Sequence, residues 1–259
     1  MFDSIAGDYD SLNHILSLDV DKIWRRRALK QIVDAPAPVR VLDLACGTGD
    51  FSIAIAKALS RPFRQAQRPT HAVTEPVEVT GASVVAEPGR TTSSATGSHV
   101  TGVDLSEGML AVMREKVAKA GLADMISIEE GDGEALRFPD NTFDRVTIAF
   151  GIRNFENREK GLREMLRVLK PGGRLVILEL SRPGNPVIRW FYDLYFLHIL
   201  PKIGGKVSGD KAAYAYLPAS VAAFPGKKEF SATMRKASFH SVTHKAFTLG
   251  ICRMYTGEK

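Results

Sequence analysis

Apolar residues recur along the chain in short runs, and segments with the period of a helix separate these runs. Five apolar residues fall within the seven positions from Val39 to Ala45, which is typical of a strand buried on both faces of a parallel sheet. The segment FSIAIAKAL, which starts at Phe51, predicts a helix. Further strands are expected with centres near residues 102, 127, 146 and 177, so the pattern predicts five strand–helix units and an α/β fold.

The C-terminal part of the chain has a different pattern. We expect a helical region from Val187 to about Ala223 and a second helix near Lys228 to Phe239. The segments SVTHKAFT and ICRMYTG then predict a β-hairpin that turns near Gly250. An N-terminal helical segment, residues 1–34, precedes the first strand. We expect one domain, residues 1–259, because the chain is long enough to bury one sizeable core.

One segment, residues 62–98, departs from these patterns. It contains no Leu, Ile, Met or Lys, it is rich in Thr, Pro, Ala and Ser, and it has no sustained period of a strand or a helix. Such a composition buries too little apolar surface to offset the entropy of ordering the chain. We therefore expect a mostly disordered insertion between the first helix and the second strand. A regulatory or partner-binding segment is the alternative.

Composition and charge exclude few classes of function. The net charge of +6 is compatible with nucleic acid, an anionic membrane surface or acidic ligands. The two cysteines, Cys46 and Cys252, have neither metal-site spacing nor a disulfide framework, which fits a reducing cytoplasm. We expect no signal peptide. The most apolar late stretch, VIRWFYDLYFLHIL, contains Arg189, Asp193 and His198, so a membrane span is not expected there.

The loop after the first strand carries the first candidate chemistry. Gly47 and Gly49 allow the backbone to approach a ligand at the start of the next helix, and Thr48 lies between them. The third position of a dinucleotide-binding glycine pattern is Ser52. Asp43 precedes the turn, and negative charge there suits a cation such as S-adenosylmethionine better than a pyrophosphate. A purely structural turn is the alternative.

Two further acids follow strands. Asp104 ends the second strand, where a carboxylate can accept hydrogen bonds from both hydroxyls of a ribose. Asp132 and Gly133 lie in a polar turn after the third strand, where the acid is a candidate acceptor for the amino group of adenine. The alternatives are a turn-forming acid before a helix for Asp104 and an Asx-type turn for Asp132.

Together these segments resemble class I S-adenosylmethionine-dependent methyltransferases. YDSLNHILSLDVDKIW and RVLKPGGRLVILELS are similar to the two signatures of the ubiquinone/menaquinone biosynthesis C-methyltransferases, and AFGIRN is similar to a further segment of that family. The resemblance implies a Rossmann-like, seven-stranded sheet with a terminal antiparallel hairpin. It also implies that S-adenosylmethionine is the methyl donor, that no metal is needed, and that the substrate is a prenylated naphthoquinol.

The implied reaction is the C-methylation of demethylmenaquinol to menaquinol, the last step of menaquinone biosynthesis. The related methylation in ubiquinone biosynthesis is an alternative. Less favoured alternatives are a nucleic-acid methyltransferase, suggested by the basic charge, and a non-catalytic protein that binds S-adenosylmethionine. No nucleic-acid partner is expected. A cytoplasmic protein is implied, and contact with the inner face of the membrane and a homodimer are left open.

The resemblance also assigns catalytic candidates. Arg153 and Asn154 follow the fourth strand, and we expect Arg153 to stabilise a phenolate while any proton passes through water, since a guanidinium is a poor base. A structural ion pair of Arg153 with Glu156 or Glu179 is the alternative. His198 is a candidate for proton transfer, and a structural role in an aromatic helix is its alternative.

Substrate contacts are expected from two segments. Tyr9 and Asn13 belong to the segment 1–34, which is a candidate lid over the cofactor, although helix capping would explain them as well. Tyr192 and Tyr195 belong to the helical region 187–223 on the expected substrate side. Core packing is the alternative for both tyrosines.

Overall fold

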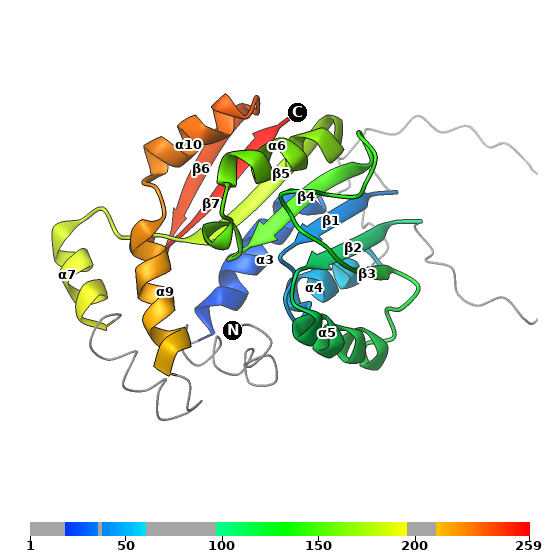
Figure 1. Cartoon of the computed structure of the whole chain (residues 1–259), viewed down its shortest axis with the longest axis horizontal. Helices are drawn as coiled ribbons and strands as arrows, with labels where there is room; N and C mark the ends of the chain where they lie inside the picture. The colour runs from blue at the N-terminus through cyan, green and yellow to red at the C-terminus, as the bar shows by residue number, and fades with distance from the viewer. Residues whose placement is uncertain (1–18, 36–37, 61–96, 196–210) are drawn as a thin grey trace, which may run out of the picture.

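A seven-stranded sheet runs through the centre of the computed structural model, which describes residues 19–35, 38–60, 97–195 and 211–259 (Figure 1). The strand order is β3-β2-β1-β4-β5-β7-β6, and the five strands from β1 to β5 run parallel. Strand β7 is antiparallel to both β5 and β6. The expected sheet with a terminal antiparallel hairpin is therefore confirmed. The strands are β1 (Arg40–Leu44), β2 (His99–Asp104), β3 (Ile126–Glu130), β4 (Phe143–Ala149), β5 (Leu169–Leu180), β6 (His240–Phe247) and β7 (Cys252–Glu258).

Helices cover both faces of the sheet and bury one apolar cluster on each face. The first cluster lies under α3 (Val20–Ile32), α4 (Asp50–Leu59) and α5 (Glu107–Lys119). The second lies under α6 (Arg158–Val168) and α10 (Lys227–Lys236). The buried strands carry apolar side chains toward both clusters, as expected for a parallel sheet. None of the helices in the described part of the chain is long and apolar enough to cross a membrane.

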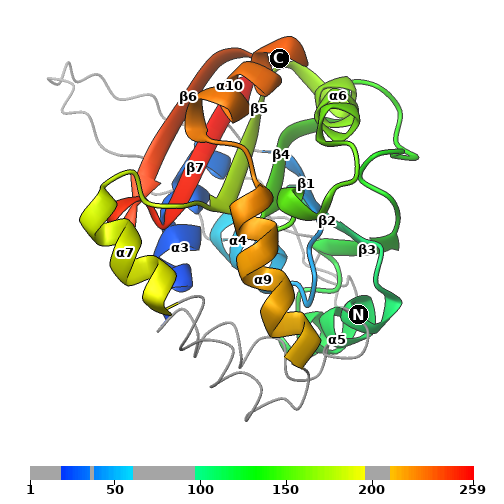
Figure 2. The ribbon, with the colours of Figure 1, turned by 60° about the vertical axis from the view of Figure 1, so that its left-hand side comes forward.

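Two more helices lie beyond the carboxyl ends of the parallel strands (Figure 2). They are α7 (Pro186–Leu194) and α9 (Lys211–Ala223), and residues 196–210 between them lie outside the described part of the chain. In the described residues of the expected helical region from Val187 to Ala223, the chain forms α7 and α9. The short 3₁₀ helices η1 (Ile152–Asn154) and η3 (Thr248–Gly250) lie at the same edge.

The last helix is shorter than the sequence predicts. It ends at Lys236, because Ser238 takes a left-handed conformation with φ of 73° and the N–H of Phe239 donates to the carbonyl of Met234. This is a Schellman-type C-terminus, which stops a helix and turns the chain. Phe239 is consequently a buried core residue just before β6.

The end of the predicted insertion belongs to the core. Ser98, placed at the end of the segment 62–98, is buried, and its Oγ accepts a hydrogen bond of 3.0 Å from the backbone N–H of Val39. The N–H of His99 also donates to the carbonyl of Val39 at 2.9 Å. Ser98 therefore fixes the start of β2 next to β1. Residues 61–96 lie outside the described part of the chain.

Candidate active site

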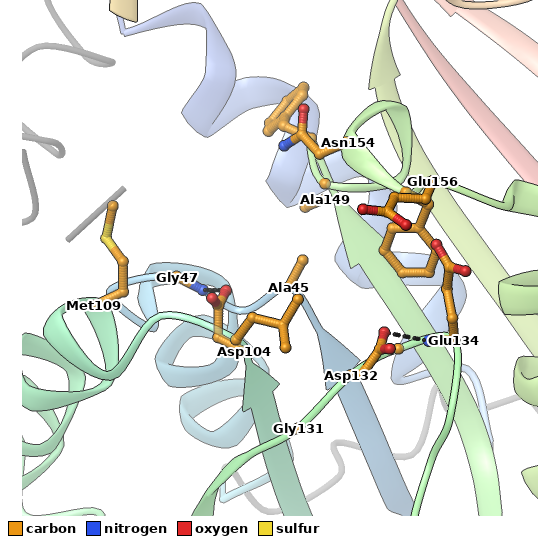
Figure 3. Close-up of a pocket in the computed structure, with 15 residues that line it drawn as sticks. Ala45, Gly47, Asp104, Met109, Gly131, Asp132, Glu134, Ala149, Asn154 and Glu156 are labelled. Atoms are coloured by element: carbon orange, nitrogen blue, oxygen red, sulfur yellow. Dashed lines mark hydrogen bonds between the residues drawn. The ribbon is translucent and has the colours of Figure 1, made fainter. Parts of the chain in front are cut away.

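A cavity of about 320 Å³ opens at the carboxyl ends of the first four strands (Figure 3). Each loop that follows one of these strands contributes to it. The lining residues are Ala45 and Gly47 after β1, Asp104, Leu105 and Met109 from the end of β2 onward, Gly131–Glu134 after β3, Ala149–Gly151 from the end of β4 onward, and Asn154–Glu156 from the end of η1 onward. Five predicted site residues are thereby brought together: Gly47, Asp104, Asp132, Gly133 and Asn154.

Asp104 connects the loops after β1 and β2. Its Oδ2 accepts the backbone N–H of Gly47 at 2.8 Å, and its Oδ1 accepts the N–H of Ser106 at 2.9 Å. The Oγ of Ser106 in turn caps α5 by accepting from the N–H of Met109. A carboxylate offers about four lone-pair sites, and these two bonds use one on each oxygen. Asp104 therefore orders the glycine turn and also presents a carboxylate to the cavity.

The other candidates around the glycine turn lie beneath it rather than on the cavity wall. Asp43 is buried, and its Oδ2 accepts a 2.6 Å hydrogen bond from the hydroxyl of Ser52. Burial raises the pKa of the Asp43 carboxyl to about 7. Thr48 is also buried, and its Oγ1 accepts from Nζ of Lys116 at 3.3 Å. These residues support the turn, and direct contact with a cofactor stays a prediction for them.

Gly49 explains why the turn is compact. Its φ is 82°, and a Cβ at this position would lie 2.4 Å from Cγ of Met113. The adjacent α4 starts at Asp50, whose carboxylate forms an ion pair with Arg25 of α3 at 3.2 Å. The same carboxylate forms an ion pair with Lys116 of α5. These charges fasten three helices around the glycine turn.

Asp132 is a turn residue that lines the cavity, and its contact with adenine stays a prediction. Its Oδ1 accepts the backbone N–H of Glu134 at 2.8 Å, which makes it the Asx-type turn residue of the alternative interpretation. It also lines the cavity. Gly133 lies against the ring of Phe155, because a Cβ there would approach Cζ of that ring to 2.5 Å.

Arg153 lies behind the cavity wall and does not line the cavity. Its Nη1 lies 2.9 Å from Oε1 of Glu179, which is fully buried, and the same Nη1 donates to the carbonyl of Phe150. The other Glu179 oxygen, Oε2, accepts the backbone N–H of Arg153 at 3.1 Å. The geometry is thus that of the structural ion pair with Glu179. This pair holds the loop in which Phe150 takes a φ of 63°.

Asn154 is the polar side chain at the cavity rim beyond β4 (Figure 3). Its Oδ1 accepts a 2.9 Å hydrogen bond from the hydroxyl of Tyr216, a residue of α9. Since Oδ1 is the acceptor in this bond, the amide offers the two N–H donors of Nδ2 to other groups. Tyr216 therefore fixes how Asn154 presents its donors.

The remaining candidates lie either outside the described residues or away from the cavity lining. Tyr9, Asn13 and His198 lie outside the described residues. Tyr192 is buried in α7, burial raises the pKa of its hydroxyl, and neither Tyr192 nor the half-buried Tyr195 lines the cavity. The core-packing interpretation therefore describes Tyr192, and substrate contact stays a prediction for both tyrosines.

Several lining residues were not expected from the sequence. Leu105 is 66% exposed although it is large and apolar, and it directly follows Asp104. Met109 and Phe155 also lie on the cavity wall. An apolar residue placed next to a strand-terminal acid was the available signal for Leu105. The positions of Met109 and Phe155 depend on how α5 and the loop beyond η1 fold back, which no local pattern reveals.

Comparisons with known proteins agree on one group. A family model described as the ubiE/COQ5 methyltransferase family matches residues 1–259. The ubiquinone/menaquinone biosynthesis C-methyltransferase UbiE of Geobacter sulfurreducens is 45% identical over the whole of this chain and 87% of its own length. The demethylmenaquinone methyltransferase of Thermus thermophilus is 39% identical, and the match covers both chains completely.

Solved structures share the fold at low sequence identity. An S-adenosylmethionine-dependent methyltransferase from Thermotoga maritima superposes with a TM-score of 0.60 at 17% identity, covering 100% of this chain and 97% of that one. A second such enzyme, from Aquifex aeolicus, gives a TM-score of 0.55 at 17% identity and covers 90% and 88% of the two chains. The similarity to these structures concerns the fold.

Proposed function

Because the chain belongs to the ubiE/COQ5 methyltransferase family along its whole length, we propose that it methylates a ring carbon of demethylmenaquinol and forms menaquinol. S-adenosylmethionine is the methyl donor. The name of the Thermus relative supports this substrate. The related methylation of a ubiquinone precursor is the second candidate, because the name of the Geobacter relative covers both quinones.

The negative charge of the cavity is the observation that best supports S-adenosylmethionine as the cofactor. Four carboxylates line it, those of Asp104, Asp132, Glu134 and Glu156, and none of the described lining residues is a lysine or an arginine. A pyrophosphate would meet charge of its own sign there, whereas a ligand that carries a sulfonium and an ammonium group would be attracted. When bound, S-adenosylmethionine supplies an electrophilic methyl group on positively charged sulfur.

We assign the cofactor contacts to the loops after β1, β2 and β3. The Asp104 carboxylate is next to the Gly47 turn, so it can accept both hydroxyls of a ribose that lies across this turn. The turn at Asp132 and Gly133 forms the next part of the wall, where the adenine ring would follow the ribose. Leu105 and Met109 offer apolar surface to that ring.

The reaction requires a more nucleophilic ring carbon. This carbon becomes nucleophilic when the neighbouring quinol hydroxyl loses its proton, so the site must stabilise a phenolate. We assign this task to the amide N–H groups of Asn154, whose orientation the hydrogen bond from Tyr216 fixes. The ring carbon gains the methyl group and loses a proton. One proton returns to the phenolate oxygen, so the methylation releases one proton overall and the product is a quinol. We assign the proton transfers to water, since the nearby guanidinium of Arg153 is a poor base.

In this proposal Arg153 stabilises the loop behind the cavity wall and does not contact the substrate. Its ion pair with Glu179 holds the loop that carries Phe150 and Asn154 on the cavity wall. Gly151 keeps this loop close to the glycine turn, because a Cβ there would lie 2.4 Å from Cβ of Ala45. Holding the reacting groups in one geometry supplies much of the acceleration in such a transfer. A catalytic role for His198 stays a prediction.

The proposed domain organisation follows from where the segments join the sheet. Helix α3 is the described part of the lid segment 1–34, and its first half lies at the cavity edge, where the Trp24 ring is 6.1 Å from the ring of Phe150. Residues 61–96, the predicted insertion, connect the end of α4 to the start of β2. The end of α4 and the start of β2 lie at the amino edge of the parallel strands, opposite the cavity. A homodimer stays a prediction.

A direct assay tests the function. The protein is incubated with S-adenosylmethionine carrying a labelled methyl group and, separately, with demethylmenaquinol, the corresponding benzoquinol precursor of ubiquinone, and RNA. We expect label in menaquinol. Label in the benzoquinol alone would select the second candidate, and label in RNA or in no product would refute the proposal. Complementation of strains that lack each methylation step distinguishes the two quinols in the cell.

A further inference from the structure

Helix α7 exposes a ridge of large apolar side chains. Val187, Trp190, Phe191 and Leu194 are 64%, 61%, 60% and 39% exposed, and their spacing puts them on one face of the helix. The opposite face carries the buried Tyr192. A contiguous exposed apolar patch of this kind marks an interaction surface. We call these four residues the α7 ridge.

A second exposed apolar residue lies beside the beginning of α7. Leu249, in the turn between β6 and β7, is 71% exposed. The chain that enters α7 is fastened to this turn, because the hydroxyl of Ser181 donates to the carbonyl of Gly250 at 2.7 Å. A Cβ on Gly250 would also lie 3.6 Å from Cα of Pro183. The apolar surface therefore continues from α7 onto the hairpin turn.

Helix α3 brings a cationic side chain, Arg27, to the same turn, and Arg26 directly precedes it in the helix. Arg26 and Arg27 are exposed, and neither forms an ion pair within the part of the chain that the structure describes. The guanidinium of Arg27 lies over the ring of Phe247 at 5.2 Å, and Nε1 of Trp24 donates to Oγ1 of Thr248 at 2.9 Å. Figure 2 shows α7, the hairpin turn and α3 at one end of the sheet.

This end of the sheet is also the edge at which the cavity opens. Strand β5 ends at Leu180, which pairs with Cys252 at the start of β7, so α7 and the hairpin turn both leave the sheet at the carboxyl edge. We propose that the α7 ridge, Leu249 and the α3 cations Arg26 and Arg27 form a docking surface for an anionic phospholipid bilayer. The inference rests on the proposed function, because a prenylated quinol resides in the bilayer.

The chemistry of the surface fits this partner. Tryptophan and phenylalanine side chains favour the interface between water and hydrocarbon, and exposed arginines attract anionic headgroups. A second copy of this chain fits less well. A symmetric contact through the same surface would bring the four arginines of the two copies into one interface, and like charges repel.

Tryptophan fluorescence provides a direct test, because the chain has two tryptophans, Trp24 and Trp190. Trp24 is 5% exposed and Trp190 is 61% exposed. The full chain is mixed with phosphatidylglycerol vesicles that carry bromine on their acyl chains, and with phosphatidylcholine vesicles of the same kind. We expect quenching by the anionic vesicles, and we expect the Trp190→Phe variant to lose the quenched component while the Trp24 emission stays.

Vesicle flotation tests the charged half of the surface. The double variant Arg26→Glu with Arg27→Glu should bind the anionic vesicles more weakly by about tenfold or more. Lys57→Glu with Lys228→Glu is the matched control, because it makes the same change of net charge on exposed residues of α4 and α10. An equal loss in both double variants would mean that net charge alone determines the binding, and this would overturn the inference.

Two further outcomes would overturn the proposal. One is the absence of quenching with the wild-type chain. The other is a dimer in solution that Trp190→Ser with Phe191→Ser converts to a monomer, with no vesicle binding by either form, because a second copy would then cover the ridge. Turnover of a short-chain, water-soluble demethylmenaquinol distinguishes a failure of the docking surface from a failure of the proposed function. The variant Trp190→Ser with Phe191→Ser should keep this turnover. If the wild-type chain does not turn over this substrate, the proposed function alone is refuted.

Discussion

Replacing Asp104 with alanine removes the group that joins the glycine turn to the expected ribose position. In the structure the carboxylate accepts the N–H of Gly47 at 2.8 Å and the N–H of Ser106 at 2.9 Å. Both bonds disappear in Asp104→Ala, and so do the two bonds that the proposed function assigns to the ribose hydroxyls. The variant therefore loses a cofactor contact and the preorganisation of the turn.

The magnitude follows from the number of charged hydrogen bonds. A hydrogen bond to a charged group contributes about 1.5–3 kcal/mol, so the two ribose bonds together contribute about 3–6 kcal/mol. Since about 1.4 kcal/mol corresponds to a tenfold change in affinity, the dissociation constant should rise by a factor of roughly 10² to 10⁴. The bonds to Gly47 and Ser106 stabilise the folded protein, so their loss lowers the free energy of unfolding and is not counted in this factor.

Calorimetry with S-adenosylhomocysteine measures this affinity without turnover. Thermal unfolding of the same samples establishes that the variant is folded at the temperature of the titration. Glu156→Gln is a matched control: it removes one negative charge from the lining of the same cavity, at a residue to which no cofactor contact is assigned. Its affinity should stay within about threefold of wild type, which is roughly 0.7 kcal/mol. A folded Asp104→Ala variant whose dissociation constant changes as little would refute the ribose assignment.

Three further predictions concern the loop beyond β4 and the core below the glycine turn. Arg153→Met should destabilise the fold by about 3–5 kcal/mol, because Glu179 would stay buried without its ion-pair partner. Adding Glu179→Gln should restore the free energy of unfolding, measured by denaturant titration. Restored turnover in that double variant would refute any electrostatic role of the guanidinium. Tyr216→Phe should lower kcat by about 2- to 10-fold, the contribution of one neutral hydrogen bond, with unchanged cofactor affinity; an unchanged kcat would separate this bond to Asn154 from the reaction. Burial raises the pKa of Asp43 from 3.8 to about 7, so the unfolded chain releases this proton at lower pH than the folded chain. The free energy of unfolding relative to Asp43→Asn should therefore fall as the pH rises from about 4 to about 7 and then stay level. A difference that is constant over this range would contradict the raised pKa of Asp43.

The sequence was sufficient for the sheet because its signals are local. Runs such as Val39–Ala45 bury both faces of a strand, and each strand that they predict is present near its expected centre. Asp104 was also predictable, since an acid at the end of a parallel strand must lie at the carboxyl edge, where ligands bind. Asp43 precedes a turn in the same way, but it lies within β1, and the alternation of side chains along the strand directs it toward Ser52.

The sequence left two candidate partners for Arg153, Glu156 and Glu179, and only the tertiary structure shows which of them forms the ion pair. Arg153 and Asn154 are adjacent in the sequence, yet one is buried behind the cavity wall and the other lines the cavity. The 3₁₀ turn that contains both residues is held by Glu179, which comes from the end of the neighbouring strand β5. The contact between Tyr216 and Asn154 likewise joins elements 62 residues apart. Sequence patterns identify such residues as candidates, and only packing decides which of them faces the ligand.

Parallel connectivity explains why the parts with proposed roles gather at one edge of the sheet. Each strand from β1 to β5 ends at the same edge, so the glycine turn, the loop with Asn154 and the entry to α7 are brought together by topology alone. The return connections, including residues 61–96, must then begin at the opposite edge, where added length costs little because loop-closure entropy grows only logarithmically. A bilayer that contacts α7 would therefore face the cavity side of the sheet, and the end of α4 and the start of β2 would lie on the side turned toward water.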